Sequence, residues 1–222
     1  MVEKLLTRRF ISFNMYVGSV AALGAELVKY LELSERVWVA CLNTHSFVVA
    51  RRSKAFHRAL TSCSFIVPDG IGVKLLAQII GINPACRVTG YDVFYAVSAL
   101  SSTEPKLRRV FLLGSTPVVL EEMKRKMEAE WPFISVVGSL SPSFSPQLDG
   151  AEAEEVKSII NNSGADVLWV ALTAPKQEIF LSAVWPELQV SFAAGVGAVF
   201  DFYAGKVRRP NELYRRFGLE WL

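Results

Sequence analysis

The strongest constraint on the fold is an alternation of short apolar runs with longer stretches of helical periodicity. Nearly uncharged runs rich in β-branched and aromatic residues occupy 36–42, 64–67, 110–114, 135–138 and 166–172. Most lead into a stretch whose apolar residues recur at three- and four-residue spacing. Alternating strands and helices predict an α/β fold, and continuous apolar strands predict a mainly parallel sheet covered on both faces. We therefore expect a Rossmann-like sheet flanked by helices.

The N-terminal stretch 10–25 carries no charge and follows Arg8 and Arg9, as the apolar part of a signal peptide does. It contains Asn14 and serines, however, and it is shorter than the roughly 20 residues that a membrane-spanning helix needs. We favour a strand over 10–16 and a helix over about 19–33, with a signal peptide as the alternative. A further helical stretch is expected from 43 through Leu60.

The chain length and composition fit one domain. With 222 residues, 51% of them hydrophobic, the chain can build one sizeable core, so we predict a single domain over residues 1–222. A Ser- and Pro-rich loop near 139–147 would be the hinge if that domain has two lobes. Cys41, Cys63 and Cys86 are odd in number and form no CxxC pair, which argues against a disulfide framework or a zinc site and fits a reducing compartment.

The net charge of +3 is mild, but the basic residues cluster. One cluster lies in RRSKAFHR (51–58), and a second comprises Arg208, Arg209, Arg215 and Arg216. Each is either a solvated helix face or a contact with phosphates or anionic lipid headgroups. Because the sequence has no nucleic-acid-binding motif and no interleaved aromatic and basic stripe, we expect no nucleic-acid partner.

Ligands of open parallel sheets bind beyond the carboxyl ends of the strands. That rule selects five turns in which polar residues and glycines concentrate: Asn43–His45, Pro68–Gly72, Gly114–Thr116, Thr173–Glu178 and Gly195–Asp201. Each turn is weak evidence by itself, but a parallel sheet would bring all five to one edge.

Asp69, in FIVPDGIG (65–72), stands where a short apolar strand ends. It can cap the helix that begins nearby, or it can act as a catalytic base. The two roles are compatible because a helix N-terminus favours the ionised carboxylate. Gly70 and Gly72 would leave room for a ligand close to the backbone.

Three further turns offer groups for an anionic or nucleotide ligand. Backbone N–H groups of GST (114–116) could hold a phosphate, although such turns also occur without a ligand. In GVGAVFD (195–201) the glycines allow close approach, and Asp201 could accept a hydrogen bond from a ribose hydroxyl. In PKQE (175–178) Lys176 suits neither the start of a helix nor its dipole, which indicates an anionic ligand.

Neither histidine points clearly to catalysis. His45 follows Asn43 at a strand end and could serve as a general base, but a lone histidine is more often structural or solvated. His57 lies within the basic cluster and is expected at the surface. No Ser-His-Asp order and no metal-ligand spacing is present.

Seven segments, taken together, resemble one protein family. CLNTHSF, VPDGIG, TGYDVF, FLLGST, APKQEIF, GVGAVFDFYAGKVRR and GLEWL occur in the order seen in the WecG/TagA/CpsF glycosyltransferases. The resemblance runs from about residue 10 to residue 222, and PDGIG, PKQE and FD-x-x-AG-x-x-x-R are its most specific parts.

The resemblance implies a bacterial enzyme that moves an N-acetylmannosamine-type or related hexose sugar from a UDP donor, with inversion to a β linkage. The acceptor in that family is a polyprenyl diphosphate carrying N-acetylglucosamine, and the products feed wall teichoic acid, enterobacterial common antigen, capsule or exopolysaccharide. The family needs no known metal cofactor. Because the acceptor stays in the bilayer, the resemblance also implies a cytoplasmic enzyme that is peripheral at the inner face of the cell membrane.

The resemblance also assigns residues to the site. Asp69 matches the proposed catalytic base, Asn43 matches the asparagine of the family's T-x-N motif, and Cys41 stands in place of its threonine. Arg209 matches the arginine that follows the AG motif. The substrate- and nucleotide-binding set, expected from the turns and the resemblance together, comprises Gly70, Gly114, Ser115, Thr173, Lys176, Gln177, Gly195, Gly197, Asp201 and Arg209.

Three positions depart from the family pattern. Cys41 donates only a weak hydrogen bond, TA at 173–174 replaces Gly-Ser, and RPN at 209–211 replaces Arg-Ala-Pro. Many members continue past LEWL with a basic tail that aids membrane attachment and helps to complete the site. This chain ends there, at Leu222, either because it is a piece of a longer protein or because it lacks the tail.

An inverting transfer needs one base for the acceptor hydroxyl and positive groups around the leaving diphosphate. We assign the first role to Asp69 and the second to Lys176, Arg209 and nearby helix N-termini. The alternative is a nucleotide-sugar-binding homologue with little or no catalysis, for which Cys41 would be the reason. The basic and aromatic segment 207–222 either lies in the membrane interface or packs on the core. The oligomeric state stays open, a homo-oligomer included.

Overall fold

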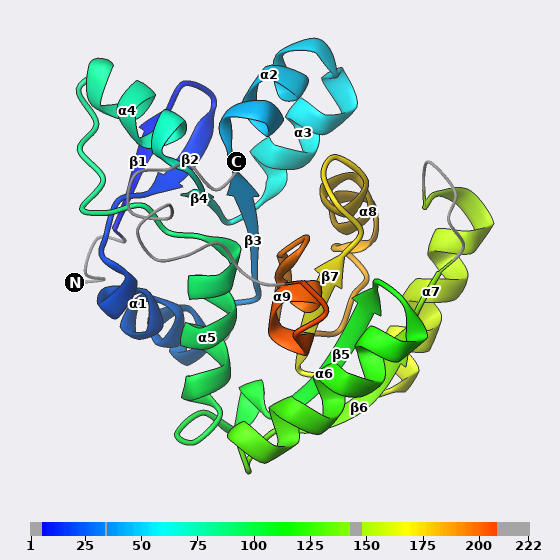
Figure 1. Ribbon diagram of the computed structural model, residues 1–222. Coiled ribbons are helices and arrows are strands. Elements are labelled where there is room, and N and C mark those ends of the chain that lie inside the picture. The colour runs from blue at the N-terminus through cyan, green and yellow to red at the C-terminus, as the bar shows by residue number, and fades with distance from the viewer. Residues whose placement is uncertain (1–5, 34, 143–147, 208–222) are drawn as a thin grey trace.

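The computed structural model describes residues 6–33, 35–142 and 148–207. Within this part of the chain, eight strands form one sheet with the order β1-β2-β4-β3-β8-β7-β5-β6 (Figure 1). β1 pairs antiparallel with β2, and the other pairings are parallel. The strands are β1 (Thr7–Phe10), β2 (Phe13–Tyr16), β3 (Val37–Leu42), β4 (Phe65–Pro68), β5 (Arg109–Gly114), β6 (Ser135–Leu140), β7 (Val167–Ala171) and β8 (Phe192–Gly195).

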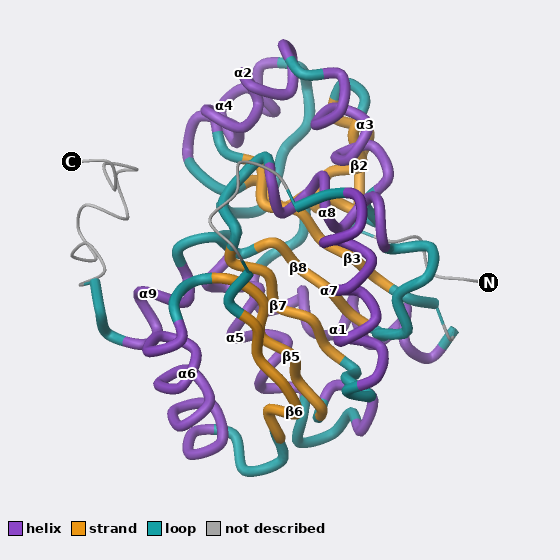
Figure 2. Tube along the Cα trace, turned by 90° about the vertical axis from the view of Figure 1, so that its right-hand side faces the viewer, coloured by secondary structure: helices purple, strands orange, loops and turns teal. Residues whose placement is uncertain are grey.

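Helices connect the strands and cover both faces of the sheet (Figure 2). They are α1 (Val20–Glu32), α2 (Thr44–Arg52), α3 (Lys54–Ser62), α4 (Ile71–Ile79), α5 (Gly90–Leu100), α6 (Pro117–Glu130), α7 (Gly150–Asn162), α8 (Lys176–Val184), α9 (Val199–Ala204) and the short 3₁₀ helix η1 (Pro105–Leu107). The predicted α/β class, with a mainly parallel sheet between helices, is confirmed.

The strands divide the interior into two cores because their side chains alternate between the faces. In β3, Val37 and Val39 face a core that is shared with α1, α5, α6 and α9. Trp38 and Ala40 face a second core, shared with α2, α3, α4, α7 and α8. The carboxyl ends of β3, β4, β5, β7 and β8 therefore lie along one edge of a sheet that is covered on both sides.

The stretch 10–16 is not the single strand that we predicted. β1 and β2 form an antiparallel hairpin that turns at Ile11, whose φ of 56° lies in the left-handed region. The sequence at this turn contains no glycine, proline or asparagine, so the usual signal for a hairpin is absent. β2 pairs with β4 and buries Phe13 and Met15. The helix expected over about 19–33 is α1, and its N-cap is Ser19.

The helical stretch expected through Leu60 is two helices. Ser53 ends α2 and caps α3, where its hydroxyl accepts the Phe56 N–H at 3.2 Å. The expected Ser/Pro-rich loop begins later than predicted, because β6 extends to Leu140. Much of the predicted hinge, 143–147, lies outside the described residues, so the hinge and the single domain over 1–222 stay predictions.

Candidate active site

A pocket of about 410 Å³ lies at the carboxyl edge of the sheet. Four of the five turns that the sequence selected contribute to its lining, namely those that follow β3, β4, β7 and β8. The first turn of α5 supplies a further side. β3 and β8 are neighbours in the sheet although they lie far apart in the chain, so the pocket sits where the N-terminal and C-terminal strands meet.

The pocket brings together about half of the predicted site residues. These are Cys41, Asn43, Asp69, Thr173, Gln177 and Gly197. His45, which we weighed as a general base, also lines it. Residues that the sequence reasoning did not assign to the site complete the lining: Ser46, Thr89, Gly90, Tyr91, Ala174, Val196, Ala198, Val199 and Phe202.

Asp69 is held between the ends of two strands. Its backbone N–H donates to the carbonyl oxygens of Leu42 at 3.0 Å and Val67 at 2.9 Å. The prediction that Asp69 caps α4 is wrong, because the N-cap is Gly70, which has a φ of 107° and makes no side-chain cap hydrogen bond. Asp69, one residue before this cap, is half-buried and lines the pocket.

Asn43 combines a structural and a site position. It is the N-cap of α2, where its Oδ1 accepts the Ser46 N–H at 2.8 Å. This bond fixes the amide plane, and the side-chain NH₂ remains as the group that can donate to a ligand. Asn43 therefore caps a helix and also lines the pocket, whereas Asp69 lines the pocket without being the N-cap of α4.

Gln177 bridges the pocket wall and the protein interior. Its Oε1 accepts the Gly197 N–H at 3.2 Å, and its Nε2 donates to Glu178 Oε1 at 2.8 Å. Gly195 lies directly against it, since a Cβ on Gly195 would come within 2.9 Å of the Gln177 side chain. The sequence placed Gly195 in the pocket wall; the structure places it behind Gln177, where it makes room for that side chain.

Glu178 is fully buried, at 0% exposure, and Oε2 has no hydrogen-bond partner among the described atoms. Burial raises the pKa of this carboxyl to about 7, and the hydrogen bond from Gln177 lowers it only in part. Glu178 stands in the first turn of α8, where a carboxylate suits the helix dipole, but the sequence gave no sign that it is buried. That property depends on the packing of α8 against α3 and α7.

Cys41 carries a neutral thiol. Its pKa lies well above the usual range because the thiol is desolvated and because the carboxylates of Asp69, Glu178 and Asp92 are close. A Cβ on Gly90 would approach the sulfur to 3.3 Å, so the small residue at the start of α5 lets the two elements meet. Cys41, like Cys63 and Cys86, is a free cysteine.

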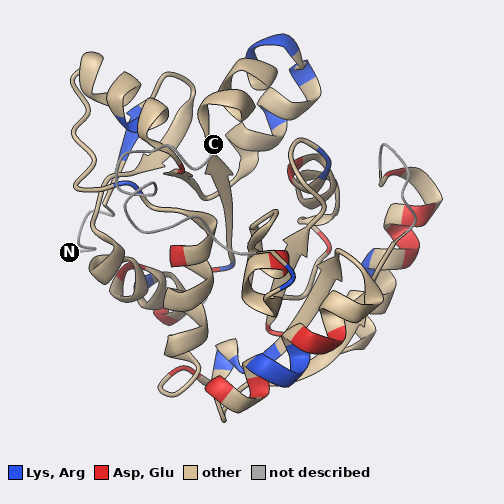
Figure 3. Cartoon of the chain, viewed as in Figure 1, with Lys and Arg blue, Asp and Glu red and all other residues tan. Residues whose placement is uncertain are grey.

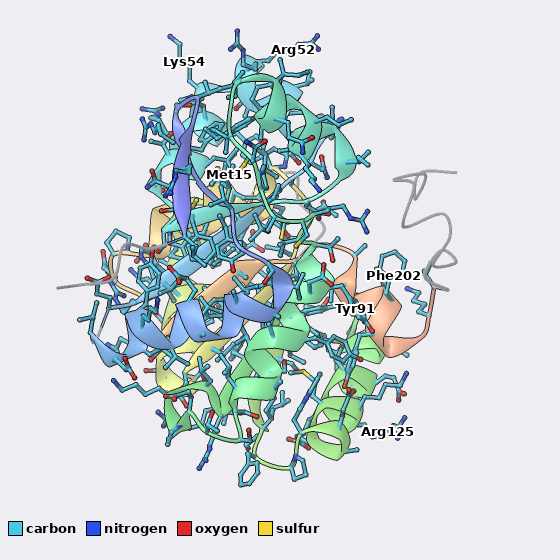
Figure 4. All side chains as sticks on the ribbon, turned by 90° about the vertical axis from the view of Figure 1, so that its left-hand side faces the viewer. Met15, Arg52, Lys54, Tyr91, Arg125 and Phe202 are labelled. Atoms are coloured by element: carbon cyan, nitrogen blue, oxygen red, sulfur yellow. The ribbon has the colours of Figure 1, made fainter. Side chains whose placement is uncertain are left out.

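The start of α5 is the main part of the site that the sequence reasoning missed. Thr89 caps the helix in a capping box with Asp92: the Thr89 hydroxyl accepts the Asp92 N–H at 3.3 Å, and Asp92 Oδ2 accepts the Thr89 N–H at 2.8 Å. The signal was present, because a threonine three residues before an acid is the pattern of such a box. Tyr91 follows on the pocket side, and Figure 4 shows it near Phe202 of α9.

Several predicted residues are absent from the pocket lining. Ser115 and Asp201 meet each other, with a Ser115 Oγ to Asp201 Oδ1 distance of 3.4 Å, but neither lines the cavity. Gly114, Lys176 and Gly70 do not line it either, although Gly70 follows Asp69 directly. Arg209 falls outside the described residues, so its predicted role has no structural test.

Backbone strain concentrates at this edge of the sheet. Ser115, directly after β5, and Thr173, two residues after the end of β7, adopt positive φ angles of 56° and 61°. Such angles are costly for residues with a Cβ and persist where the surrounding fold imposes them, often at ligand sites.

The electrostatics of the pocket combine helix N-termini with carboxylates. Four helices of nine residues or more, α2, α4, α5 and α8, begin beside lining residues. Their free N–H groups and dipoles favour an anionic ligand. No group of three or more His, Cys, Asp or Glu residues suited to a metal occurs in the described part of the chain. Across 6–33, 35–142 and 148–207, no helix is both long and apolar enough to cross a bilayer.

Comparison with known proteins identifies the family. The sequence profile of the glycosyl transferase WecG/TagA/CpsF family matches residues 8–222. The chain belongs to this family. As a WecG/TagA/CpsF protein it is a glycosyltransferase, and the resemblance that the sequence motifs indicated is confirmed.

Two curated WecG/TagA/CpsF-like relatives carry the same name, N-acetylglucosaminyldiphosphoundecaprenol N-acetyl-beta-D-mannosaminyltransferase. The protein from Bacillus spizizenii is 31% identical over 193 residues, which cover 87% of this chain and 72% of the relative. The protein from Bacillus subtilis is 28% identical over 194 residues, covering 86% of this chain and 72% of the relative.

Proposed function

We propose that this glycosyltransferase moves an N-acetylmannosamine-type sugar from a UDP donor to a polyprenyl-diphosphate-linked sugar, with inversion at the anomeric carbon. The observation that carries the proposal is a carboxylate, Asp69, beside a pocket around which four helices begin. The names of the two relatives support the sugar and the acceptor. The product would be an intermediate of a bacterial cell-surface polysaccharide.

Asp69 is the general base of the proposed reaction. The acceptor hydroxyl attacks the anomeric carbon, Asp69 takes its proton, and the bond from that carbon to the UDP oxygen breaks with its electron pair leaving on UDP. A positioned base of this kind contributes roughly 10²–10⁴-fold to a rate. Asn43, fixed by its cap hydrogen bond, is placed to donate to a sugar or phosphate oxygen in the same pocket.

The leaving UDP needs positive groups around its phosphates. The N-terminus of α8, with Lys176 at its first position, supplies one, and the start of α2 supplies another. We assign the nucleotide to the side of the pocket formed by Thr173, Gln177 and Gly197, with the uracil stacked on Tyr91 or Phe202. We propose no metal for this step, since cationic groups and helix dipoles can carry the charge of the diphosphate.

The proposed acceptor sets the place of action. A polyprenyl diphosphate remains in the bilayer, so the enzyme would work at the inner face of the cell membrane while it remains peripheral to it.

Acceptor-dependent UDP release tests the proposal. The purified chain is incubated with UDP-N-acetylmannosamine, UDP-N-acetylglucosamine or UDP-glucose, with and without a short-chain polyprenyl-diphosphate-N-acetylglucosamine analogue. We expect UDP to appear only with the first donor and the acceptor together, and equally in excess EDTA. Release without acceptor would contradict transfer. UDP binding without any release would favour the alternative, a nucleotide-sugar-binding homologue in which Cys41 has weakened the site.

A further inference from the structure

Helix α4 is apolar on its exposed side as well as its buried side. Val73 and Ala77 pack into the core. On another face, Ile71, Leu75 and Ile79 follow one another at four-residue spacing and are 40%, 51% and 81% exposed. A surface helix of a protein surrounded by water normally presents polar residues there, so this stripe indicates a partner.

The neighbouring helices α2 and α3 are basic. Arg51, Arg52, Lys54 and Arg58 are exposed, and none of them pairs with a carboxylate in the described part of the chain. Arg51, Lys54 and Arg58 line a second hollow of about 510 Å³ together with His57. Figure 3 shows these cations at the end of the molecule where α4 also lies.

The apolar stripe and the cations lie on neighbouring helices. α2 and α4 are in contact, and the first turn of α4 lies so close to Thr44 of α2 that a Cβ on Gly72 would come within 2.3 Å of its hydroxyl. From Arg36 to Tyr91 the chain has seven Lys and Arg residues and one acid, Asp69, which belongs to the pocket. We call the exposed side of α4 with the cations of α2 and α3 the basic–apolar face.

We propose that the basic–apolar face docks on an anionic lipid bilayer, with the stripe of α4 seated among the headgroups and first acyl carbons. An apolar stripe flanked by unpaired cations, with no exposed acid between them, is complementary to such a surface. A second copy of the chain would present the same cations and would therefore repel its partner.

The position of α4 connects docking with the reaction. α4 begins immediately after Asp69 and Gly70, so the stripe follows a residue of the pocket directly in the chain. A docked α4 would hold Asp69 at the membrane surface, where the head of a lipid-linked acceptor lies. The choice of a bilayer as partner rests on the proposed polyprenyl acceptor, but the docking can be measured without any substrate.

Vesicle flotation of the full chain tests the face. We compare vesicles of phosphatidylcholine with vesicles that contain 30% phosphatidylglycerol, using wild type and Leu75→Gln/Ile79→Gln. The matched control is Val118→Gln/Ile159→Gln, which changes two exposed apolar helical residues elsewhere, Val118 being 80% exposed. We expect the α4 variant to lose about 10- to 100-fold in partitioning to anionic vesicles, and the control to lose less than about twofold.

The cationic part is tested in the same way. Arg51→Gln/Arg58→Gln should weaken partitioning by about 30-fold, and more at low salt than at high salt, because each surface cation contributes about 1 kcal/mol of attraction to an anionic membrane. Lys124→Gln/Arg125→Gln on α6 removes the same charge and should have little effect. Figure 4 shows Arg125 far from Arg52 and Lys54.

The outcomes separate the proposal from its rivals. Equal flotation of wild type and both face variants, with unchanged thermal midpoints, would overturn it and leave the segment 207–222 as the anchor. A change of oligomeric state in Leu75→Gln/Ile79→Gln with unchanged flotation would also overturn it and make the face a contact between copies. If flotation falls as expected while no donor supports transfer, the docking face stands and the proposed function fails.

Discussion

At the amino-terminal edge of the sheet, cationic side chains are paired with protein groups, whereas at the carboxyl edge polar groups and strained backbone surround a pocket. Arg109, which opens β5, donates to Asp166 through its N–H at 3.0 Å and through Nη2 at 2.8 Å. Arg36, just before β3, donates to the carbonyl oxygens of Trp185 and Leu188 behind α8. At the other edge, Glu178 is buried with an unsatisfied oxygen and Thr173 has a positive φ.

The difference between the two edges shows where the fold retains features that lower its stability. Paired cations at the amino-terminal edge hold strand ends and helix ends together. The carboxyl edge keeps features that each lower stability, and they are retained around one cavity, as expected for a ligand site. Changes at the first edge should therefore affect stability with little effect on transfer, and changes at the second should affect transfer or the pH dependence of stability.

The largest expected effect is that of Asp69→Asn. Removal of the proposed base should lower acceptor-dependent UDP release by roughly 10²–10⁴-fold. The affinity for UDP, measured by calorimetry, should stay within about threefold, since the amide keeps the shape of the side chain. Asp149→Asn, an exposed carboxyl outside the pocket lining, is the matched control. Unchanged turnover in Asp69→Asn would remove Asp69 from the mechanism.

Glu178→Gln should alter how stability depends on pH. The folded pKa of Glu178 is about 7 and the ordinary value is 4.5. Between pH 4.5 and 7 the carboxyl is therefore protonated in the folded state and ionised in the unfolded state. The wild type should therefore lose on the order of 3 kcal/mol of unfolding free energy through this group as the pH rises from about 4.5 to 7. Glu178→Gln lacks this loss.

Chemical denaturation at pH 5 and pH 8 measures the effect of Glu178. The unfolding free energy of Glu178→Gln minus that of wild type should be larger at pH 8 than at pH 5. Glu155→Gln, at an exposed position of α7, serves as control and should follow the wild type. Parallel pH dependences of Glu178→Gln and wild type would show that Glu178 is not buried as an acid.

Asp166→Ala tests the amino-terminal edge. The variant leaves the Arg109 N–H and guanidinium without their acceptor, so the unfolding free energy should fall by about 1–2 kcal/mol. Acceptor-dependent UDP release by the folded variant should stay within about twofold of wild type. A large loss of turnover at full folding would mean that the two edges are not functionally distinct.

The smallest expected effect is that of Cys41→Thr. A hydroxyl in place of the neutral thiol restores an ordinary hydrogen bond, worth about 0.5–1.5 kcal/mol, so transfer should rise by at most about tenfold. Cys86→Thr, outside the pocket lining, is the control. A gain of several hundredfold would favour the alternative that the natural site is a weak or inactive nucleotide-sugar binder.

The fold was largely predictable because its strands are continuous apolar runs between clear turns. Parallel topology followed from that pattern, and it predicted that Asn43, Asp69 and Gln177 lie at one edge of the sheet. The hairpin at Ile11 was not predictable, since its turn contains no glycine, proline, asparagine or aspartate. The break at Ser53 was also missed: serine is a favoured N-cap residue, but no glycine or proline marks the end of the preceding helix.

The site was predictable only in part, because position at a strand end does not decide which side of the edge a residue faces. Ser115 and Asp201 lie at the right edge but contact each other rather than the pocket. The burial of Glu178 depends on the packing of α8 against α3 and α7 on one face of the sheet, which local sequence does not encode. Thr89 and Asp92 carried a readable capping pattern that a search limited to strand ends overlooked.

The pH dependence of kcat/KM for transfer is the most direct test of Asp69 as the base. Wild type and Asp69→Asn are compared in a Glu178→Gln background, so that the second titrating carboxyl of the site is absent. The account predicts that the rate rises with pH as one group ionises, and that the residual activity of the Asp69→Asn enzyme is flat over the same range. The account would be contradicted if the Asp69→Asn enzyme kept the wild-type rate and the same rise of kcat/KM with pH.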